Sequence, residues 1–375
     1  MNIKNSVSYN LQAILGTKTN RKILVIESDD WGSIRMPSKK SYENLLRAGI
    51  PVNKCPYNTF DLLEISEDIE ALTNFCQSIK DINGNPLKVT ANFIMANPDF
   101  EKIKAYNFEK YYFTDLSETY QFYQGDTKTL DTIYEAVESN VLVPQLHGRE
   151  HLQVNHWLDA LRSNETETRL AFNNGVWGHP SAYEKKSGIN FSSAFHITTE
   201  KELAFAKESI IDASKLFEKY FGSSSKTFIA PRFIWPLELE STFASVGIKA
   251  IQGKLVQLYP KIVMIDNKLN KKINWTGKSN KSGLNYLIRN VFFEPTQKPN
   301  FAWESDAIKR IETAFFWGKP AVISMHRLNF MGGFSEENRR NGLKRLSALI
   351  QSVQKKYPEV EFLSSKELNE VVYGK

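Results

Sequence analysis

Short apolar runs rich in β-branched residues alternate along the chain with longer stretches whose apolar residues recur at helical spacing. Runs of the first kind are typical of strands buried in a sheet, and the longer stretches are typical of helices that cover it. Strands are predicted at residues 22–28, 88–96, 141–146, 227–230, 248–252, 287–293, 321–325 and 360–363. Helices are predicted at residues 67–80, 129–139, 200–220, 237–246, 307–317 and 336–356. This alternation indicates an α/β protein, built as a barrel or as an open parallel sheet.

The length of 375 residues leaves room for two or three domains, or for one large barrel with insertions. No linker rich in Pro or Gly divides the chain, so we expect a single domain over residues 1–375. Two regions, about 37–86 and 158–225, look like loop insertions with structure of their own.

Charge and cysteine content narrow the class of protein without naming a function. The 48 Lys and Arg against 42 Asp and Glu give a charge of +6 that is mixed in sign, so no nucleic-acid partner is expected. Cys55 and Cys76 lack metal-site spacing and are expected to be free thiols in a reducing compartment. The sequence has no run that could form a signal peptide or a transmembrane helix, and we expect a cytoplasmic location.

The first chemical candidate is a pair of aspartates, Asp29 and Asp30, directly after the strand at residues 22–28. Where a strand ends, the chain turns and both carboxylates can reach one pocket. One could then bind a metal while the other takes a proton. The alternative is that they only cap the following turn, where Asp is favoured.

A second candidate follows the strand at residues 141–146, where His147 and His151 are four residues apart. In a helical turn this spacing places both imidazoles on one face, close enough to share a zinc ion. With Glu150 the segment also spells the H-x-x-E-H signature of inverted zinc peptidases, which needs a continuous helix. His156 would point away from His147 on a helix, and we interpret it as structural.

Arg232 and His326 each follow a further predicted strand. Arg232 could orient a carboxylate, and His326 could act as an acid or base near neutral pH. Taken alone, Arg232 could instead be a surface arginine, and His326 could be a structural histidine. In parallel α/β folds, however, the carboxyl ends of the strands meet at one edge where sites are built. Asp30, His147 and His151 would there form a three-ligand set with an open metal position, as catalytic sites require.

In their order, these motifs resemble those of the polysaccharide deacetylase family of carbohydrate esterases, the NodB-homology family. The resemblance implies a distorted (β/α) barrel of about seven to eight strands, here with two large loop insertions. It implies that Asp30, His147 and His151 hold a divalent metal, usually Zn²⁺. It also implies that Asp29 is the catalytic base, that Arg232 tethers Asp29, and that His326 is the acid.

The sequence departs from the family pattern in several places. The Arg232 turn reads Pro-Arg-Phe-Ile-Trp-Pro, and the spacing of 117 residues between Asp30 and His147 is long. The family's fourth motif, whose Asp orients the catalytic His, is not found. Asp266 and Trp275 are the nearest candidates for it.

Aromatic and basic residues near these motifs bear on the substrate. Trp31 and Trp235 could stack on sugar rings, although tryptophans in such a chain are more often core. Residues 268–281 carry five lysines, which could form a solvated loop or a patch for an anionic glycan, a nucleotide diphosphate or a lipid phosphate.

These expectations combine into a metal-dependent hydrolase that removes acetyl groups from an N- or O-acetylated sugar of a surface glycan or its precursor. The expected partner is an acetylated carbohydrate, with peripheral contact to a lipid-linked glycan as a further option. Two alternatives stay open: an inverted-zincin-type metallopeptidase, and an inactive glycan-binding domain on the same fold. Acetate release and metal content separate the three.

Overall fold

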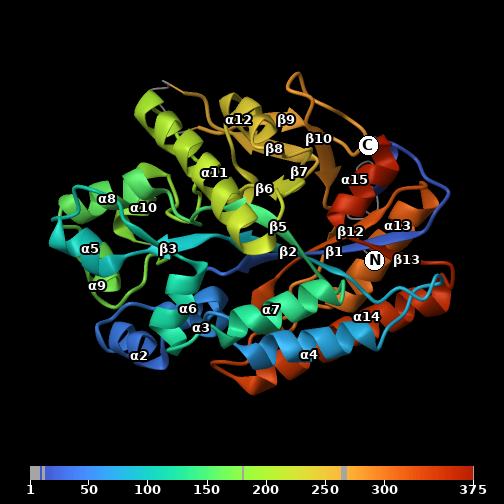
Figure 1. The fold of residues 1–375 in the computed structure, drawn as a ribbon, viewed down its shortest axis with the longest axis horizontal. Helices are drawn as coiled ribbons and strands as arrows, with labels where there is room; N and C mark the ends of the chain where they lie inside the picture. Colours follow the sequence, from blue (N-terminus) through green and yellow to red (C-terminus); the bar gives the residue numbers. More distant parts are fainter. Residues whose placement is uncertain (1–8, 11–12, 180, 263–267, 375) are drawn as a thin grey trace.

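The computed structural model describes residues 9–10, 13–179, 181–262 and 268–374. Its centre is a curled sheet in which every pairing is parallel, in the order β10-β7-β6-β5-β2-β1-β12-β11, with β13 also paired to β1 (Figure 1). These strands are β1 (Ile23–Trp31), β2 (Val89–Ile94), β5 (Leu142–Gly148), β6 (Thr227–Ile229), β7 (Ala250–Gly253), β10 (Asn285–Ile288), β11 (Val291–Phe292), β12 (Ala321–His326) and β13 (Glu361–Leu363). The architecture is that of a distorted (β/α) barrel, as expected.

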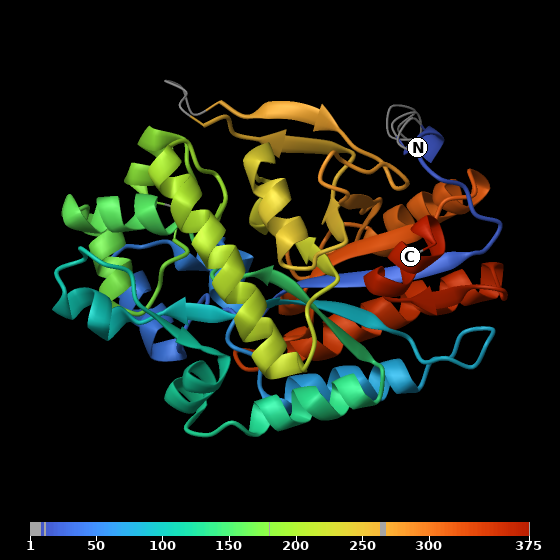
Figure 2. The same cartoon turned by 45° about the horizontal axis from the view of Figure 1, so that its top comes forward.

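Helices cover the sheet on its outer side, and α4 and α7 lie side by side in both views (Figures 1 and 2). The helices in the covering layer are α4 (Ser66–Gln77), α7 (Lys128–Glu138), α11 (Glu200–Phe221), α12 (Glu240–Ser245), α13 (Trp303–Phe316) and α14 (Glu336–Lys356). Helix α15 (Ser365–Tyr373) packs on the other face of the sheet, where its Leu368 clusters with Val25, Leu287 and Val322. The two ends of helix α11 illustrate how local sequence determines where a helix begins and ends. Thr199 and Glu202 form a capping box at its start, and Gly222 ends it with a positive φ of 70°.

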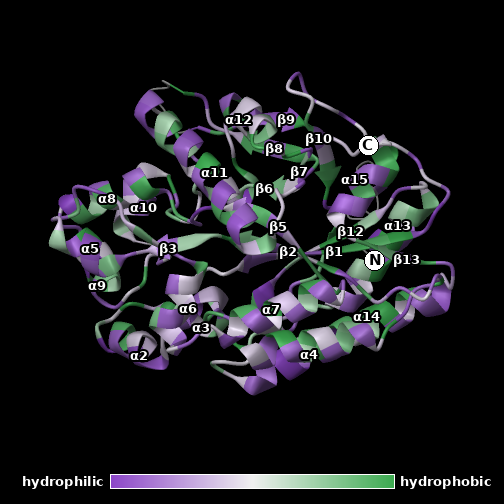
Figure 3. Ribbon diagram, viewed as in Figure 1, coloured by the Kyte–Doolittle hydropathy of each residue, from purple (hydrophilic) through white to green (hydrophobic). Residues whose placement is uncertain are grey.

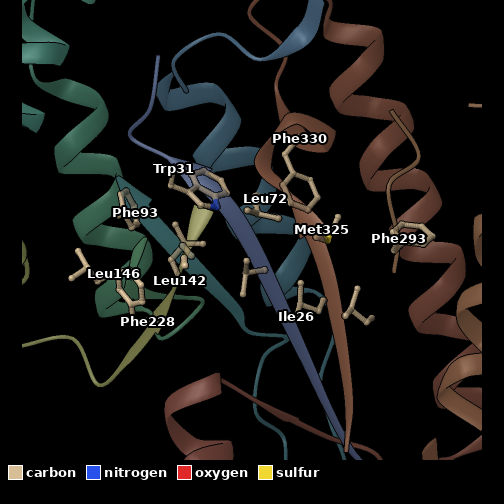
Figure 4. Packing of buried hydrophobic residues seen from close by; sticks show 14 of the residues in the cluster. Ile26, Trp31, Leu72, Phe93, Leu142, Leu146, Phe228, Phe293, Met325 and Phe330 are labelled. Carbon is tan, nitrogen blue, oxygen red and sulfur yellow. The ribbon is translucent and has the colours of Figure 1, made fainter. Parts of the chain in front are cut away.

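The core lies between the strands and these helices. Every residue of β1 is buried, and so is every residue of β2. In Figure 3, which colours the chain by hydropathy, helices such as α4 and α14 carry both hydrophilic and hydrophobic residues. Figure 4 shows Trp31, Leu72, Phe93 and Met325 packed together around β1. Burial of such side chains contributes about 1.5–3 kcal/mol each, so the core fixes the strands that carry the site.

The two regions expected to be insertions hold mainly helices. Residues 37–86 contain α2 (Lys39–Arg47), η1 (Val52–Lys54), α3 (Pro56–Phe60) and α4. Residues 158–225 contain the end of α8 (Val154–Arg162), then α9 (Thr166–Asn173), α10 (Ala182–Ser187) and α11. Helices α8, α9 and α10 lie together with α5 (Phe100–Ala105) at the left of Figure 1.

The remaining elements are short: β3 (Ala96–Pro98), β4 (Phe113–Asp115), α6 (Leu116–Gln124), η2 (Pro231–Phe233), η3 (Leu237–Leu239), β8 (Val256–Tyr259), β9 (Asn270–Ile273) and η4 (Arg327–Phe330). Strands β3 and β4 form one antiparallel pair and β8 and β9 another.

One predicted strand is divided in the structure. Residues 287–293 were expected as a single strand but fall into β10 and β11, which pair with different neighbours at the two ends of the sheet. Arg289 and Asn290 lie in the break between them, and Arg289 is fully buried. A buried guanidinium needs several acceptors, and the break turns this side chain toward carboxylates of β1.

Both cysteines are free thiols, as expected. Among the described residues, no helix is long and apolar enough to cross a membrane.

Candidate metal centre

The structure brings Asp30, His147 and His151 together. Asp30 lies near the end of β1 with a φ of 75°, which is rare for a residue other than glycine, and the pairing of β1 with β2 shifts there. Such strained backbone occurs preferentially at functional sites. His147 lies on β5, and His151 lies in the loop that follows, after Gly148 with a φ of 124°. The helical turn expected for the histidine pair is therefore wrong, although the two imidazoles do converge.

The geometry of these three side chains fits a metal ion. The Nε2 atoms of His147 and His151 each lie 3.3 Å from Oδ1 of Asp30, and each residue is at most 5% exposed. Donor atoms bound tetrahedrally to one Zn²⁺ at about 2.0–2.2 Å lie roughly 3.3–3.5 Å apart. The buried Asp–His–His group could thus hold a divalent cation.

Hydrogen bonding around the group supports the same conclusion. Nδ1 of His147 lies 2.8 Å from the carbonyl oxygen of Ile229, which can only accept, so Nδ1 donates and Nε2 is the ring nitrogen that faces Asp30. Within the described chain, neither carboxylate oxygen of Asp30 has a hydrogen-bond donor. A buried carboxylate whose oxygens lack donors and face two imidazole nitrogens is suited to binding a cation.

Asp29 lies beside this group and is held by Arg289. Nη1 of Arg289 donates to Oδ2 of Asp29 at 2.6 Å, and Nη2 donates to Oδ1 at 2.7 Å. Asn92 on β2 adds a third hydrogen bond to Oδ1, at 2.8 Å. Burial alone would raise the pKa of Asp29, but the charge and hydrogen bonds of Arg289 outweigh it and lower the pKa to about 2. Asp29 is therefore an ionised carboxylate at neutral pH.

This arrangement corrects the expected role of Arg232. The predicted tether between Arg232 and Asp29 is made by Arg289 instead, which also pairs with Glu27. Arg232 lies in the turn after β6 with a φ of 57°, and its described hydrogen bond is a long one of 3.5 Å to Ser192. Arg232 is exposed, whereas Arg289 is buried and fixed by two carboxylates.

His326 ends β12 directly opposite Asp29 on β1. Its Nδ1 lies 2.5 Å from Oε1 of Glu294, and its side chain is 22% exposed. Burial would lower the pKa of His326, but the charge and hydrogen bond of Glu294 raise it to about 9. His326 is thus an imidazolium at neutral pH, and Glu294 binds its Nδ1.

Glu294 is therefore the carboxylate that orients His326, a residue the sequence did not single out. Its other oxygen accepts a hydrogen bond of 2.9 Å from Asn329. Trp275, considered for the missing motif, lies after β9 under the ammonium of Lys278. Asp266, the other candidate, lies outside the described residues.

The two tryptophans expected at the substrate are buried in the core. Trp31 is 0% exposed and donates from Nε1 to Ser28, and its ring lies 6.3 Å from that of Phe93 (Figure 4). Trp235 belongs to the same core cluster and is 1% exposed. Both indoles are covered, so the expected sugar contact is open to neither in this structure.

Other aromatic groups take their place beside the site. The indole of Trp177 stacks on the imidazole of His151, with ring centroids 5.9 Å apart. The ring of Tyr57 meets His326 edge-on at 5.2 Å. Arg35 lies between these two aromatics, with its guanidinium 4.6 Å from the Trp177 ring and 5.2 Å from the Tyr57 ring.

The remaining polar candidates have structural partners. Glu150 forms an ion pair with Arg149, and no helix spans His147 to His151, so the helix that an inverted zincin requires is absent from this described segment. His156 hydrogen-bonds Ser187 and packs on aromatic rings, in keeping with a structural role. In the lysine-rich segment, Lys272 pairs with Glu240 and Lys278 donates to the carbonyl of Ile273.

The sequence did contain a signal for the two residues that were missed. Arg289 is the one charged residue within the apolar run 287–293, and Glu294 follows that run directly. The rule that polar residues at strand ends form the site in a parallel sheet applies to this run as well.

No family model matches the chain, and no curated protein sequence matches it. Among solved structures, a 4-α-glucanotransferase from Thermococcus litoralis is similar at 11% identity and a TM-score of 0.44 over 92% of this chain, which spans 40% of that enzyme. A candidate polysaccharide deacetylase from Mycobacterium smegmatis is similar at 10% identity and a TM-score of 0.42, covering 96% of this chain and 94% of its own. PuuE allantoinase is similar at 10% identity and a TM-score of 0.46, covering 97% and 94%. At identities and TM-scores this low, the similarity does not indicate a function, and the function has to be inferred from the side chains of the site.

Proposed function

We propose that this protein is a metal-dependent hydrolase that removes acetyl groups from an N- or O-acetylated sugar of a surface glycan or its precursor. One observation carries the proposal: an ionised carboxylate and a protonated imidazole flank a buried Asp–His–His metal group at one edge of the sheet. Hydrolysis of an amide or ester needs a base for water and an acid for the leaving group, and this edge supplies both.

Asp30, His147 and His151 would hold the cation, most favourably Zn²⁺ because of its preference for imidazole and carboxylate ligands. When bound, such a cation polarises a carbonyl and lowers the pKa of water. Asp29 accepts the proton of the attacking water. Arg289 keeps that carboxylate ionised and turned toward the site.

His326 donates a proton from Nε2 to the nitrogen or oxygen that leaves. Glu294 holds Nδ1 of the ring, which fixes its orientation and keeps it charged at neutral pH. The 22% exposure of His326 gives this proton a path to substrate.

The two alternative functions are less well supported by these residues. A peptidase of the inverted-zincin type needs a continuous helix through His147 and His151, whereas His147 lies on β5 and His151 in the loop after it. An inactive glycan-binding domain has no need of a buried base and acid beside the metal ligands.

The test is acetate release from N-acetylated and O-acetylated oligosaccharides by the zinc-loaded protein. The Asp29→Asn variant should keep its zinc and lose about 10²–10⁴-fold in turnover, since it removes the base and leaves the ligands. The Asp30→Asn variant should lose zinc as well. Asp131→Asn, an exposed change on α7, serves as the control.

Three results would overturn the proposal. They are a full rate for Asp29→Asn, peptide cleavage without acetate release, and glycan binding without turnover of any acetylated sugar.

A further inference from the structure

The guanidinium of Arg35 is a buried charge without an anionic partner. Arg35 is 8% exposed, and no carboxylate of the described residues lies within ion-pair distance of it. Its Nε is buried without a hydrogen-bond acceptor in the described chain. Arginine side chains in this state are rare, because a buried charge is normally paired.

The position of Arg35 places it over the metal centre. Its two aromatic neighbours contact the two sides of the site: Trp177 stacks on His151, and Tyr57 meets His326. The unpaired guanidinium thus lies between the metal ligands and the acid.

Packing holds this guanidinium in place. A Cβ atom added at Gly178 would lie 2.7 Å from Nη1 of Arg35, so the absence of a side chain at that position makes room for the charge. The stacking on Trp177 and Tyr57 fixes its plane. A rigid planar fork with free donors matches the geometry of a carboxylate or phosphate group.

A second arginine faces the same space. Arg232 donates a hydrogen bond of 3.5 Å to Oγ of Ser192, and the backbone N–H of the preceding residue, Phe191, is bound by Glu184. Glu184 is a carboxylate whose charge acts on both arginines, but its oxygens accept the backbone N–H groups of Ser181 and Phe191. Two cations thus share this space while the carboxylate near them is already occupied.

Building on the proposed function, we propose that Arg35 and Arg232 form an anion subsite, which selects acetylated sugars that carry a carboxylate or a phosphate group. The subsite accounts for an uncompensated charge that would otherwise only reduce stability. It also gives Arg232 a role other than the tether to Asp29, which Arg289 supplies.

The test measures binding to the metal-free protein by titration calorimetry, so that neither turnover nor metal coordination contributes. The probes are neutral N-acetylglucosamine, the carboxylate-bearing N-acetylmuramic acid, and N-acetylglucosamine 6-phosphate. We expect the charged sugars to bind about tenfold or more tightly than the neutral one. Preference for one charged sugar over the other identifies the source of the anion, and either preference supports the subsite.

Variants connect this preference to the arginines. Arg35→Gln should abolish the preference for charged sugars, Arg35→Lys should retain part of it, and Arg232→Gln should weaken it. Arg169→Gln is the matched control, because Arg169 also lies over an aromatic ring, that of Phe108, outside the site. Its preference should equal that of the unaltered chain. Circular dichroism and thermal unfolding check the fold of each variant.

Equal binding of neutral and charged sugars, or an unchanged preference in folded Arg35→Gln and Arg232→Gln, would overturn the subsite. This failure differs from failure of the proposed function. Acetate release at equal rates from neutral and charged sugars would keep the hydrolase and remove the subsite. Charged-sugar binding that depends on Arg35, without acetate release from any probe, would keep the subsite and remove the hydrolase.

Discussion

Two arginines are fully buried near the metal centre, and each is held by two carboxylates. Arg289 pairs with Glu27 and Asp29, and Arg327 pairs with Asp61 and Glu64. The first cluster ends at a carboxylate that faces the metal ligands. The second holds the chain after β1, because Arg327 donates to the carbonyl of Ser33 and Glu64 accepts the N–H of Gly32.

The pKa of a buried carboxyl group is shifted in opposite directions in the two clusters. Burial raises the pKa of Asp61 to about 6 despite the charge of Arg327, whereas Arg289 lowers the pKa of Asp29 to about 2. The hydrogen bonds explain the difference. Asp29 accepts two from Arg289 and one from Asn92, while Oδ2 of Asp61 accepts none in the described structure. The fully hydrogen-bonded carboxyl of Asp29 therefore has a lowered pKa, and the partly hydrogen-bonded carboxyl of Asp61 has a raised one.

The largest expected effect is on stability, in the Arg327→Gln variant. Removing this guanidinium leaves Asp61 and Glu64 buried without their counter-ion, which should lower the free energy of unfolding by about 3–5 kcal/mol. Urea unfolding measures it. Arg345→Gln, which breaks a half-buried pair with Glu304, is the control and should lose about 1 kcal/mol or less. Equal losses in the two variants would contradict the assignment of Arg327 as a stability element.

The next effect separates the two clusters by function. Arg289→Lys keeps the charge but loses the two-pronged contact with Asp29, so kcat should fall about 10–100-fold while zinc affinity stays unchanged. Kinetics of acetate release and zinc titration measure the two quantities. Arg327→Lys is the matched control, and its kcat per folded molecule should match that of the unaltered protein. A loss of the same size in both variants would mean that the two clusters act alike.

A third effect concerns His326, the proposed general acid. In the Glu294→Gln variant the pKa of His326 should fall from about 9 toward about 6.5, because the neighbouring negative charge is removed. NMR titration of the metal-free protein measures this pKa. Since the folded-state pKa is raised, the pair stabilises the fold fully below about pH 6.5, and this contribution is lost as the pH rises through 9. The variant should lack this alkaline loss, and an unshifted pKa would exclude Glu294 as the partner.

The sequence predicted the parallel sheet and the grouping of Asp30, His147 and His151 because both follow from local patterns. Apolar runs define β1, β5 and β12, and the polar residues at their ends meet at one edge. The convergence of His147 and His151 was expected for the wrong reason, since a strand end and a loop bring them together. Their spacing along the chain could not reveal the backbone turn at Gly148.

The partners of Asp29 and His326 could not be predicted in the same way. Arg289 and Glu294 are 260 and 32 residues away from the groups they hold, and neither belongs to a recognised spacing. Their positions depend on the break between β10 and β11. The pattern of apolar residues predicts one continuous strand there and does not reveal the break. The burial of Trp31 also depends on packing, because its place after the aspartates says nothing of which face it takes.

The smallest effect tests how much of the reactive cluster is redundant. Ser324 accepts a further hydrogen bond from Nη1 of Arg289, at 3.2 Å, and the corresponding acceptor for Arg327 is a backbone carbonyl that no side-chain substitution removes. In Ser324→Ala, Arg289 still donates to both oxygens of Asp29, so the free energy of unfolding should fall by about 1 kcal/mol and kcat by less than about fivefold. Urea unfolding and acetate release measure the two. A loss in kcat well beyond the loss in stability would show that two hydrogen bonds to Asp29 are not sufficient to position it. Ser324 would then help to position Asp29 through Arg289. The Arg289 and Arg327 clusters would differ in this side-chain hydrogen bond as well as in their ion pairs.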